Sequence, residues 1–494
     1  MSAISPASLT RNVLWNFAGQ VAPLFAAVFA IPLLIKGMGV DRFGLLTLAW
    51  MVIGYFSLFD FGLGRALIKL VSEKLGDGRR AEIPELVWTA LFLMAFLGAS
   101  GAGIMFALTG WLVTSVLKIP ASLQAEASDA FRLLAWSVPV VVLTTGFRGI
   151  LEAYRRFDLV NIVRLPLGVL TFVAPLVVLP FSNRLDVVVM MLLGVRLLIC
   201  VIQAALCERV LPGLWRRISY SSHLLRPMLR VGGWMTVSNM VSPIMVYMDR
   251  FFIGSVLGMA AVAYYVTPYE IITKLLVIPG ALVGVLFPMF SASLAGDHAR
   301  AAELFQRSVR WVFLAMFPAV LLATVFASDG LRLWLSGDFS LNGTAVLQWL
   351  AAGVLINSLG LIPVTFVQGA GRPDLTAKLH LAELPIYLLV LWLFMQKWGI
   401  VGAAAAWTLR VGFDAVVLFV MSAWLEDELS RTLKQDALIL ALALAVLALG
   451  CWPSGLATKI GFTAIVLTGF SLFAWRGLLS RDERRRIAAL LGRV

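Results

Sequence analysis

The 494-residue chain is long enough for several soluble domains, but its composition excludes them. Hydrophobic residues make up 61% of the chain and charged residues only 14%, whereas soluble domains carry about 25% charged residues. The formal net charge is +13. This composition predicts an all-α polytopic membrane protein and excludes a disordered chain, a fibre, a coiled coil and a disulfide-stapled scaffold.

Apolar segments follow one another along the whole chain, separated by charged residues or by glycine and proline. A helix needs about 20 mostly apolar residues to cross a bilayer, and longer segments cross it with a tilt. We therefore expect fourteen transmembrane helices, at residues 12–35, 43–71, 84–112, 130–152, 159–181, 186–208, 229–255, 261–290, 308–328, 344–370, 378–396, 400–424, 436–452 and 457–476.

Lysine and arginine are distributed unevenly between the two sides of these helices. Alternate loops and the two ends of the chain carry 28 of them, the opposite side carries 9, and 3 lie within helices. By the positive-inside rule, the side with 28 is cytoplasmic, so we expect both termini in the cytoplasm. Topology explains the positive charge, and no nucleic-acid partner is expected.

Motifs of enzymatic chemistry are missing from the sequence. There is no GxxxxGK[ST] phosphate loop, so the chain is not itself an ATP-driven pump. The three cysteines and three histidines are scattered, and we expect neither a disulfide framework nor a metal site. The sequence therefore predicts a protein that is not an enzyme and has no cofactor.

The first twelve predicted helices form two similar units of six. QVAP at 20–23 matches MVSP at 240–243 and Asp77 matches Asp297, both at an offset of 220. The later matches have slightly smaller offsets, as short loop deletions would produce: RFDL at 156–159 with RPDL at 372–375, and Arg196 with Arg410. Units of six helices insert in the same orientation, which is the parallel-repeat plan of many transporters.

This repeat divides the chain into four predicted parts. Residues 1–211 form an N-terminal six-helix bundle and residues 229–425 form its C-terminal counterpart. A cytoplasmic linker at 212–228 joins the two bundles. Residues 426–494 hold helices 13 and 14, which lie outside the repeat, and a basic cytoplasmic tail.

Charged side chains within predicted helices are candidates for a functional site. Such a residue costs about 2.5–3.5 kcal/mol at mid-membrane, so it usually faces a cavity or a partner. Self-neutralisation remains an alternative for the i,i+4 pairs Glu270–Lys274 and Arg410–Asp414. Snorkelling to the interface remains one for Asp249–Arg250, Arg65 and Arg148. The remaining candidates are Asp60, Arg65, Arg148, Arg196, Asp249 and Arg250.

Arg196 is the least easily explained of these residues. It lies near the middle of a predicted helix with no carboxylate three or four positions away, and its repeat mate Arg410 lies at a matching depth. Guanidinium groups suit phosphate and carboxylate. We therefore predict that both arginines line a cationic cavity for an anionic cargo, with Arg65, Arg148, Arg250 and Lys274 as further binding candidates.

Two predicted helices are interrupted at matching places. FDFGLGR at 59–65 has two glycines in the second helix, and VIPG at 277–280 lies in the eighth, which is its repeat equivalent. Interruptions at corresponding positions indicate a binding site or a bending element, although a packing kink remains the alternative.

Several strings together resemble the polysaccharide transporter (Wzx-like) branch of the MOP flippase superfamily, over residues from about 10 to 425. Fourteen helices also fit this branch. The strings are GVDRFGLLTLAW (39–50), LFDFGLGRAL (58–67), GILEAYRRFDLVN (149–161), MDRFFIGSVLG (248–258), AYYVTPYE (263–270), VQGAGRPDLTAK (367–378) and GIVGAAAAWTLR (399–410).

The resemblance implies two six-helix bundles in a V shape that open alternately inward and outward. It implies a cargo of oligosaccharide repeat units on polyprenyl pyrophosphate, moved from the cytoplasmic to the periplasmic leaflet of the bacterial inner membrane for capsule, O-antigen or exopolysaccharide biosynthesis. Its implied partners are this lipid-linked oligosaccharide, membrane lipids and polysaccharide polymerase or assembly proteins. We expect a monomer, because two halves complete one pathway.

Members of the superfamily are generally ion-driven, which implies coupling to a proton or sodium gradient. The carboxylates available for this are Asp60, Asp249, Glu270 and Asp414. A multidrug-type exporter of another amphipathic molecule and a polymerase acting on lipid-linked sugars remain alternatives. A peptidoglycan precursor is disfavoured, because Asn16, Gly19 and Gln20 stand where lipid II flippases have arginine-bearing motifs.

Overall fold

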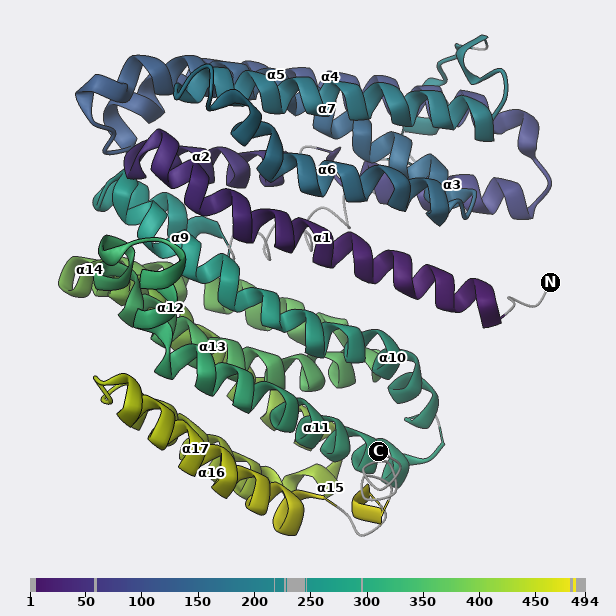
Figure 1. The fold of residues 1–494 in the computed structure, drawn as a ribbon. Coiled ribbons are helices and arrows are strands. Elements are labelled where there is room, and N and C mark those ends of the chain that lie inside the picture. The colour runs from purple at the N-terminus through teal and green to yellow at the C-terminus, as the bar shows by residue number, and fades with distance from the viewer. Residues whose placement is uncertain are drawn as a thin grey trace. The chain divides into compact units, whose positions relative to one another are not determined.

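The computed structural model describes residues 6–56, 60–216, 218–225, 228, 245, 247–294, 296–479 and 483–485. These residues form helices joined by turns, and there is no β-strand among them (Figure 1). Within them, nine helical segments are long and apolar enough to cross a membrane. The chain is therefore an all-α, multi-span membrane protein. The total of fourteen spans stays a prediction, because most of the seventh, at 229–255, lies outside the described residues.

The chain divides into two compact units, Met1–Ala263 and Tyr264–Val494. In the first unit, α5 packs between α4 and α7, and α1 packs against α6 (Figure 1). The boundaries of the four predicted parts of the chain stay predictions. The helices of this unit are α1 (Pro6–Met38), α2 (Val40–Tyr55), α3 (Leu63–Gly76), α4 (Ile83–Trp111), α5 (Ala121–Ala153), α6 (Phe157–Val178) and α7 (Leu185–Val210).

In the second unit, α13 is the central helix. In its most apolar 18-residue stretch, 78% of the residues are buried, compared with 11% in the corresponding stretch that contains α17. Helix α13 contacts α10, α11, α12 and α14. Most of the surface of α17 is therefore available to lipid. The helices are α9 (Met259–Thr273), whose first five residues belong to the first unit, α10 (Val277–Ser293), α11 (His298–Val325), α12 (Ala327–Trp334), α13 (Gly337–Gly369), α14 (Pro373–Leu425), α15 (Asp427–Ser430), α16 (Leu433–Leu449) and α17 (Leu456–Phe473).

Element α14 consists of two helices joined at a sharp turn. Gly399 has φ 56° and ψ −137°, a backbone conformation that only glycine adopts readily. The residues on either side of this turn face each other, since the imidazole of His380 lies 3.5 Å from the carboxylate of Asp414. The two spans predicted at 378–396 and 400–424 are thus an antiparallel hairpin.

The second predicted helix, 43–71, is interrupted in the structure. Its first part, α2, ends at Tyr55, and α3 begins at Leu63. Phe61 and Gly62 between them have positive φ angles of 46° and 71°. The predicted break is confirmed. It divides this helix rather than merely bending it.

The corresponding break in the eighth predicted helix lies one turn earlier than VIPG. A 3-10 turn at Lys274–Leu276 separates α9 from α10, and Pro279 falls in the first turn of α10. Proline is tolerated in the first turn of a helix because the backbone N–H groups there have no partner inside the helix. The proline therefore follows the break instead of forming it.

Several helices begin earlier than predicted. The helix predicted at 130–152 starts at Ala121, and the one predicted at 308–328 starts at His298. Their first nine and ten residues, ASLQAEASD and HARAAELFQR, combine polar residues with strong helix formers such as alanine, glutamine, glutamate and arginine. Hydropathy locates the part of a helix inside lipid and misses such polar extensions.

A buried carboxylate in one of these extensions joins three segments of the first unit. Glu126 of α5 accepts hydrogen bonds of 2.9 and 3.0 Å from the guanidinium of Arg42 in α2. It also accepts one from the backbone N–H of Leu185, the first residue of α7. One side chain thus holds the ends of α2, α5 and α7 together.

We expect Glu126→Gln to destabilise the protein by about 1.5–3 kcal/mol, the usual contribution of a hydrogen bond to a charged group. The glutamine keeps the shape but loses the charge, and its amide cannot accept both bonds from Arg42. Thermal unfolding in detergent measures the effect. Asp129→Asn is the matched control, because Asp129 is an exposed partner of Arg132 on the same helix; an equal loss in both variants would contradict the assignment.

Candidate functional site

Arg196 lies half-buried on α7, between the buried residues Val195 and Ile199 and the exposed Leu197 and Leu198. Within the part of the chain that the structure describes, it forms no ion pair and no side-chain hydrogen bond. The structure thus agrees with the sequence pattern, in which no carboxylate stood one turn away. An arginine so placed retains its full hydrogen-bonding capacity for an anion.

Arg410 lies on the second helix of the α14 hairpin. Its guanidinium carbon is 5.5 Å from the ring centre of Tyr387, which belongs to the first helix of the hairpin. The buried Nε donates no hydrogen bond to any described residue. No ion pair joins Arg410 to Asp414 among these residues, which argues against the alternative that the two neutralise each other.

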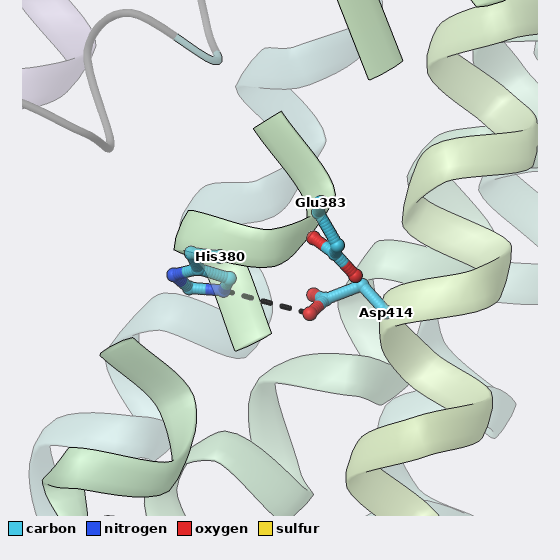
Figure 2. A group of neighbouring side chains, drawn as sticks. All are labelled: His380, Glu383 and Asp414. Carbon is cyan, nitrogen blue, oxygen red and sulfur yellow. Dashed lines mark ion pairs between the residues drawn. The ribbon is translucent and has the colours of Figure 1, made fainter. Parts of the chain in front are cut away.

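Asp414 faces a different partner, across the hairpin. His380, Glu383 and Asp414 form a group in which one ligand atom of each side chain lies within 4.8 Å of the other two. Figure 2 shows the carboxylates of Glu383 and Asp414 pointing toward one another, with the imidazole of His380 beside them. Nε2 of His380 is 3.5 Å from Oδ1 of Asp414. We call this group the hairpin cluster.

The sequence analysis does not predict His380 and Glu383 as site residues. The three histidines are scattered along the chain and show no metal-ligand spacing, and Glu383 has no pattern around it that marks a site. The sequence feature that could have indicated this cluster is the turn at Gly399, because Glu383 and Asp414 are almost equally far from that glycine along the chain. Folding the two predicted helices about that glycine places them opposite each other.

Asp60 occupies the break between α2 and α3. Its carboxylate accepts a hydrogen bond of 2.8 Å from the backbone N–H of Gly62, at the start of α3, and one of 3.3 Å from the hydroxyl of Thr145 in α5. Gly64 allows this arrangement, because a Cβ there would lie 3.0 Å from the same carboxylate. Asp60 therefore ties the residue before α3 to α5 through its carboxylate.

The remaining binding candidates of the first unit differ in exposure. Arg65 and Arg148 are exposed, and Nε of Arg148 lies 3.5 Å from Glu152 one turn further along α5. Asp249 and Arg250 are buried, and the guanidinium of Arg250 lies 5.0 Å from the ring centre of Tyr247. Burial argues against the predicted alternative that this last pair snorkels to the interface.

Glu270 and Lys274 form an ion pair of 3.1 Å at the end of α9, where both side chains are partly exposed. This geometry agrees with self-neutralisation, which is a simpler interpretation of the pair than a role in a binding site. Of the predicted residues of the second unit, the structure thus brings Arg410 and Asp414 to the α14 hairpin and places Glu270 and Lys274 together on α9 and the turn that follows it.

A cavity of about 1010 Å³ lies in the second unit, among α11, α13, the second helix of α14 and α16. Most of its lining is apolar, from residues such as Phe313, Leu409 and Leu440. Arg310 and Asp436 supply the charged groups in its wall. A cavity of this composition suits a hydrocarbon chain better than a sugar.

The sequence of this chain is similar to those of known proteins. A family described as "Polysaccharide biosynthesis protein" matches residues 38–340. A putative O-antigen transporter of Shigella flexneri is 29% identical over 83% of this chain and 97% of its own. A probable low-salt glycan biosynthesis flippase of Haloferax volcanii is 23% identical, over 35% of this chain and 36% of its own.

Solved structures share the fold at low sequence identity. The lipid II flippase MurJ, in an inward closed conformation, matches 95% of this chain and all of its own with a TM-score of 0.72 at 13% identity. An inward-facing multidrug resistance MATE family transporter of the MOP superfamily matches 85% of this chain and 96% of its own, with a TM-score of 0.69 at 16% identity. The predicted MOP-type fold is confirmed.

Proposed function

Because this chain belongs to the polysaccharide biosynthesis protein family, we propose that it is a flippase for lipid-linked oligosaccharides. It moves oligosaccharide repeat units on polyprenyl pyrophosphate from the cytoplasmic to the periplasmic leaflet by alternating access. These units supply capsule, O-antigen or exopolysaccharide biosynthesis. The similarity to a putative O-antigen transporter over 97% of that protein's length supports this cargo class.

The structural observation that carries the proposal is the lack of an ion-pair partner for Arg196 among the described residues. A guanidinium half-buried on an apolar helix, with no carboxylate partner in the described part of the chain, is costly unless an anion joins it. A pyrophosphate carries at least two negative charges and offers oxygens for bidentate hydrogen bonds. Arg196 and Arg410 are therefore the residues that we propose for binding pyrophosphate.

Other features of the chain fit the same cargo. The apolar cavity among α11, α13, α14 and α16 suits the hydrocarbon of a lipid carrier. The protein acts in the bacterial inner membrane as a monomer with both termini in the cytoplasm, and it hands its cargo to polysaccharide polymerase or assembly proteins. It moves its cargo without making or breaking covalent bonds in it.

Transport in proteoliposomes tests the proposal. The purified protein is reconstituted with a fluorescent polyprenyl-pyrophosphate oligosaccharide, and the fraction of cargo in each leaflet is followed with a membrane-impermeant quencher. We expect transfer at a rate well above that of protein-free vesicles. Transport of amphipathic drugs without any transfer of lipid-linked sugar would favour the multidrug-type exporter instead.

Energy coupling to a proton or sodium gradient is part of the same proposal, with Asp60, Asp249, Glu270 and Asp414 as candidate carboxylates. The two hydrogen bonds of Asp60 lead to a specific expectation for this residue. Asparagine keeps a side-chain oxygen that accepts from the N–H of Gly62 and an amide that can bond to the hydroxyl of Thr145. We therefore expect Asp60→Asn to keep a melting temperature close to that of the wild type and a transport rate within about twofold of it.

Asp60→Ala removes both hydrogen bonds and costs about 1.5–3 kcal/mol of stability, measured by thermal unfolding. The pair of variants separates the structural role of this carboxylate from a role in coupling. If Asp60→Asn is as stable as the wild type but no longer responds to an imposed ion gradient, then Asp60 takes part in coupling and its hydrogen bonds are not its main function.

A further inference from the structure

The hairpin cluster combines one imidazole nitrogen with two carboxylates in the interior of the second unit. Glu383 lies five residues inside the span predicted at 378–396, which is about 7.5 Å at a rise of about 1.5 Å per residue, and thus within a hydrocarbon core about 30 Å thick. Its side chain is only 3% exposed. Two acidic groups at this depth need positive charge close to them.

Described protein groups do not satisfy these carboxylates. Neither oxygen of Glu383 has a hydrogen-bond partner, and neither does Oδ1 of Asp414. His380 approaches Asp414 at 3.5 Å without making a hydrogen bond. Arg410, one turn away on the same helix, forms no ion pair with either carboxylate in the described residues. The carboxylate of Glu383 is thus a buried polar group that points into the cluster and lacks a donor (Figure 2).

We infer that His380, Glu383 and Asp414 bind a divalent metal ion of the zinc class between the two helices of α14. Borderline metals such as Zn²⁺ take imidazole nitrogen together with carboxylate oxygen. Calcium and magnesium prefer ligand sets made only of oxygen. The imidazole therefore separates this site from one built for an alkali or alkaline-earth ion.

The distances suit such an ion. With metal–ligand bonds of about 2.0–2.2 Å, neighbouring ligands in a tetrahedral site lie about 3.3 Å apart. The nitrogen of His380 and the oxygen of Asp414 are 3.5 Å apart, and all three ligand atoms lie within 4.8 Å of one another. A small rotation of one side chain completes the three-ligand set.

Charge balance also favours a divalent ion. With neutral His380, two positive charges compensate the carboxylates of Glu383 and Asp414. Arg410 then keeps its own charge, which under the proposed function is available to a phosphate of the cargo. The side chain of His380 is 30% exposed. The ion can therefore enter the site beside this residue, and a water molecule can serve as a fourth ligand.

Equilibrium metal binding tests the inference on the full chain, purified without a polyhistidine tag and treated with a chelator. We expect Zn²⁺ to bind with a stoichiometry of one per chain in isothermal titration and to raise the melting temperature. Bound Co²⁺ should give the visible absorption of a tetrahedral site. An excess of Na⁺ or Mg²⁺ should not displace the zinc.

Conservative variants identify the ligands. His380→Gln, Glu383→Gln and Asp414→Asn should each weaken Zn²⁺ binding at least tenfold. The matched control is His298→Gln, which removes the histidine of another histidine–carboxylate pair, 2.7 Å from Glu426; its binding should equal that of the wild type. The melting temperature of each metal-free variant establishes that it is folded.

Three results would overturn the inference: no zinc bound by the folded wild type, equal binding by all four variants, or displacement of zinc by Na⁺ or Mg²⁺. Absence of zinc together with a stability that changes with pH in the wild type, but not in Glu383→Gln, would mean that the two carboxylates share a proton instead. None of these measurements requires transport, so failure of the proposed flippase activity leaves this test intact.

Discussion

Replacement of Arg196 and Arg410 together by glutamine is expected to abolish transport of lipid-linked oligosaccharide while the protein still reaches the membrane. Each guanidinium supplies charge-assisted hydrogen bonds to a phosphate, and the loss of one such bond costs about 1.5–3 kcal/mol. That corresponds to about a tenfold to hundredfold loss in cargo binding for each arginine. In the proteoliposome assay, the double variant should be close to protein-free vesicles.

Single variants and a matched control make this experiment specific. Arg196→Lys and Arg410→Lys keep the charge but not the planar fork, so we expect an intermediate loss. Arg132→Gln serves as the control, because Arg132 is exposed and already paired with Asp129. Full activity of the double variant would leave the flippase in place but remove the arginines from its binding site.

A large effect on folding is expected from Gly402→Ala. A Cβ at this position would lie 2.1 Å from the backbone carbonyl oxygen of Phe394, across the turn of the α14 hairpin. The backbone has to move apart to accept it, at a cost of at least about 3 kcal/mol, the upper end of overpacking effects. We expect a strong loss of monodisperse protein in detergent and a lower melting temperature.

Gly412→Ala on the same helix is the control for this variant. No atom lies within 4 Å of a Cβ at that position, and alanine favours a helix over glycine by about 1 kcal/mol. Its stability should match or exceed that of the wild type. If both variants unfold at the same temperature, the close contact at Gly402 does not limit how the two helices pack.

Hydropathy and charge predicted the class of this protein because they report directly on the lipid environment. A residue facing lipid must be apolar, and the apolar runs therefore locate the spans, including both helices of the α14 hairpin. The polar starts of α5 and α11 could not be found in this way. They lie beyond the apolar segment, and helix formation there depends on local propensity and on contacts such as that of Glu126 with Arg42.

The candidate site was predictable to a smaller extent. Arg196 stood out because its lack of a carboxylate partner is visible within one helix. The hairpin cluster did not, because its residues come from two helices and meet only through the conformation of Gly399. The i,i+4 rule paired Arg410 with Asp414 along one helix, whereas the structure pairs Asp414 across the hairpin with His380.

The turn at Gly399 also bears on how this protein is made. A chain with acidic residues in a hydrophobic helix enters the bilayer poorly on its own, since each acidic residue adds a few kcal/mol to the cost of insertion. A tight hairpin lets residues 373–425 leave the translocon as a pair, with Glu383 and Asp414 turned toward each other rather than toward lipid. The backbone conformation of one glycine thus favours membrane insertion of two helices that would each insert less readily alone.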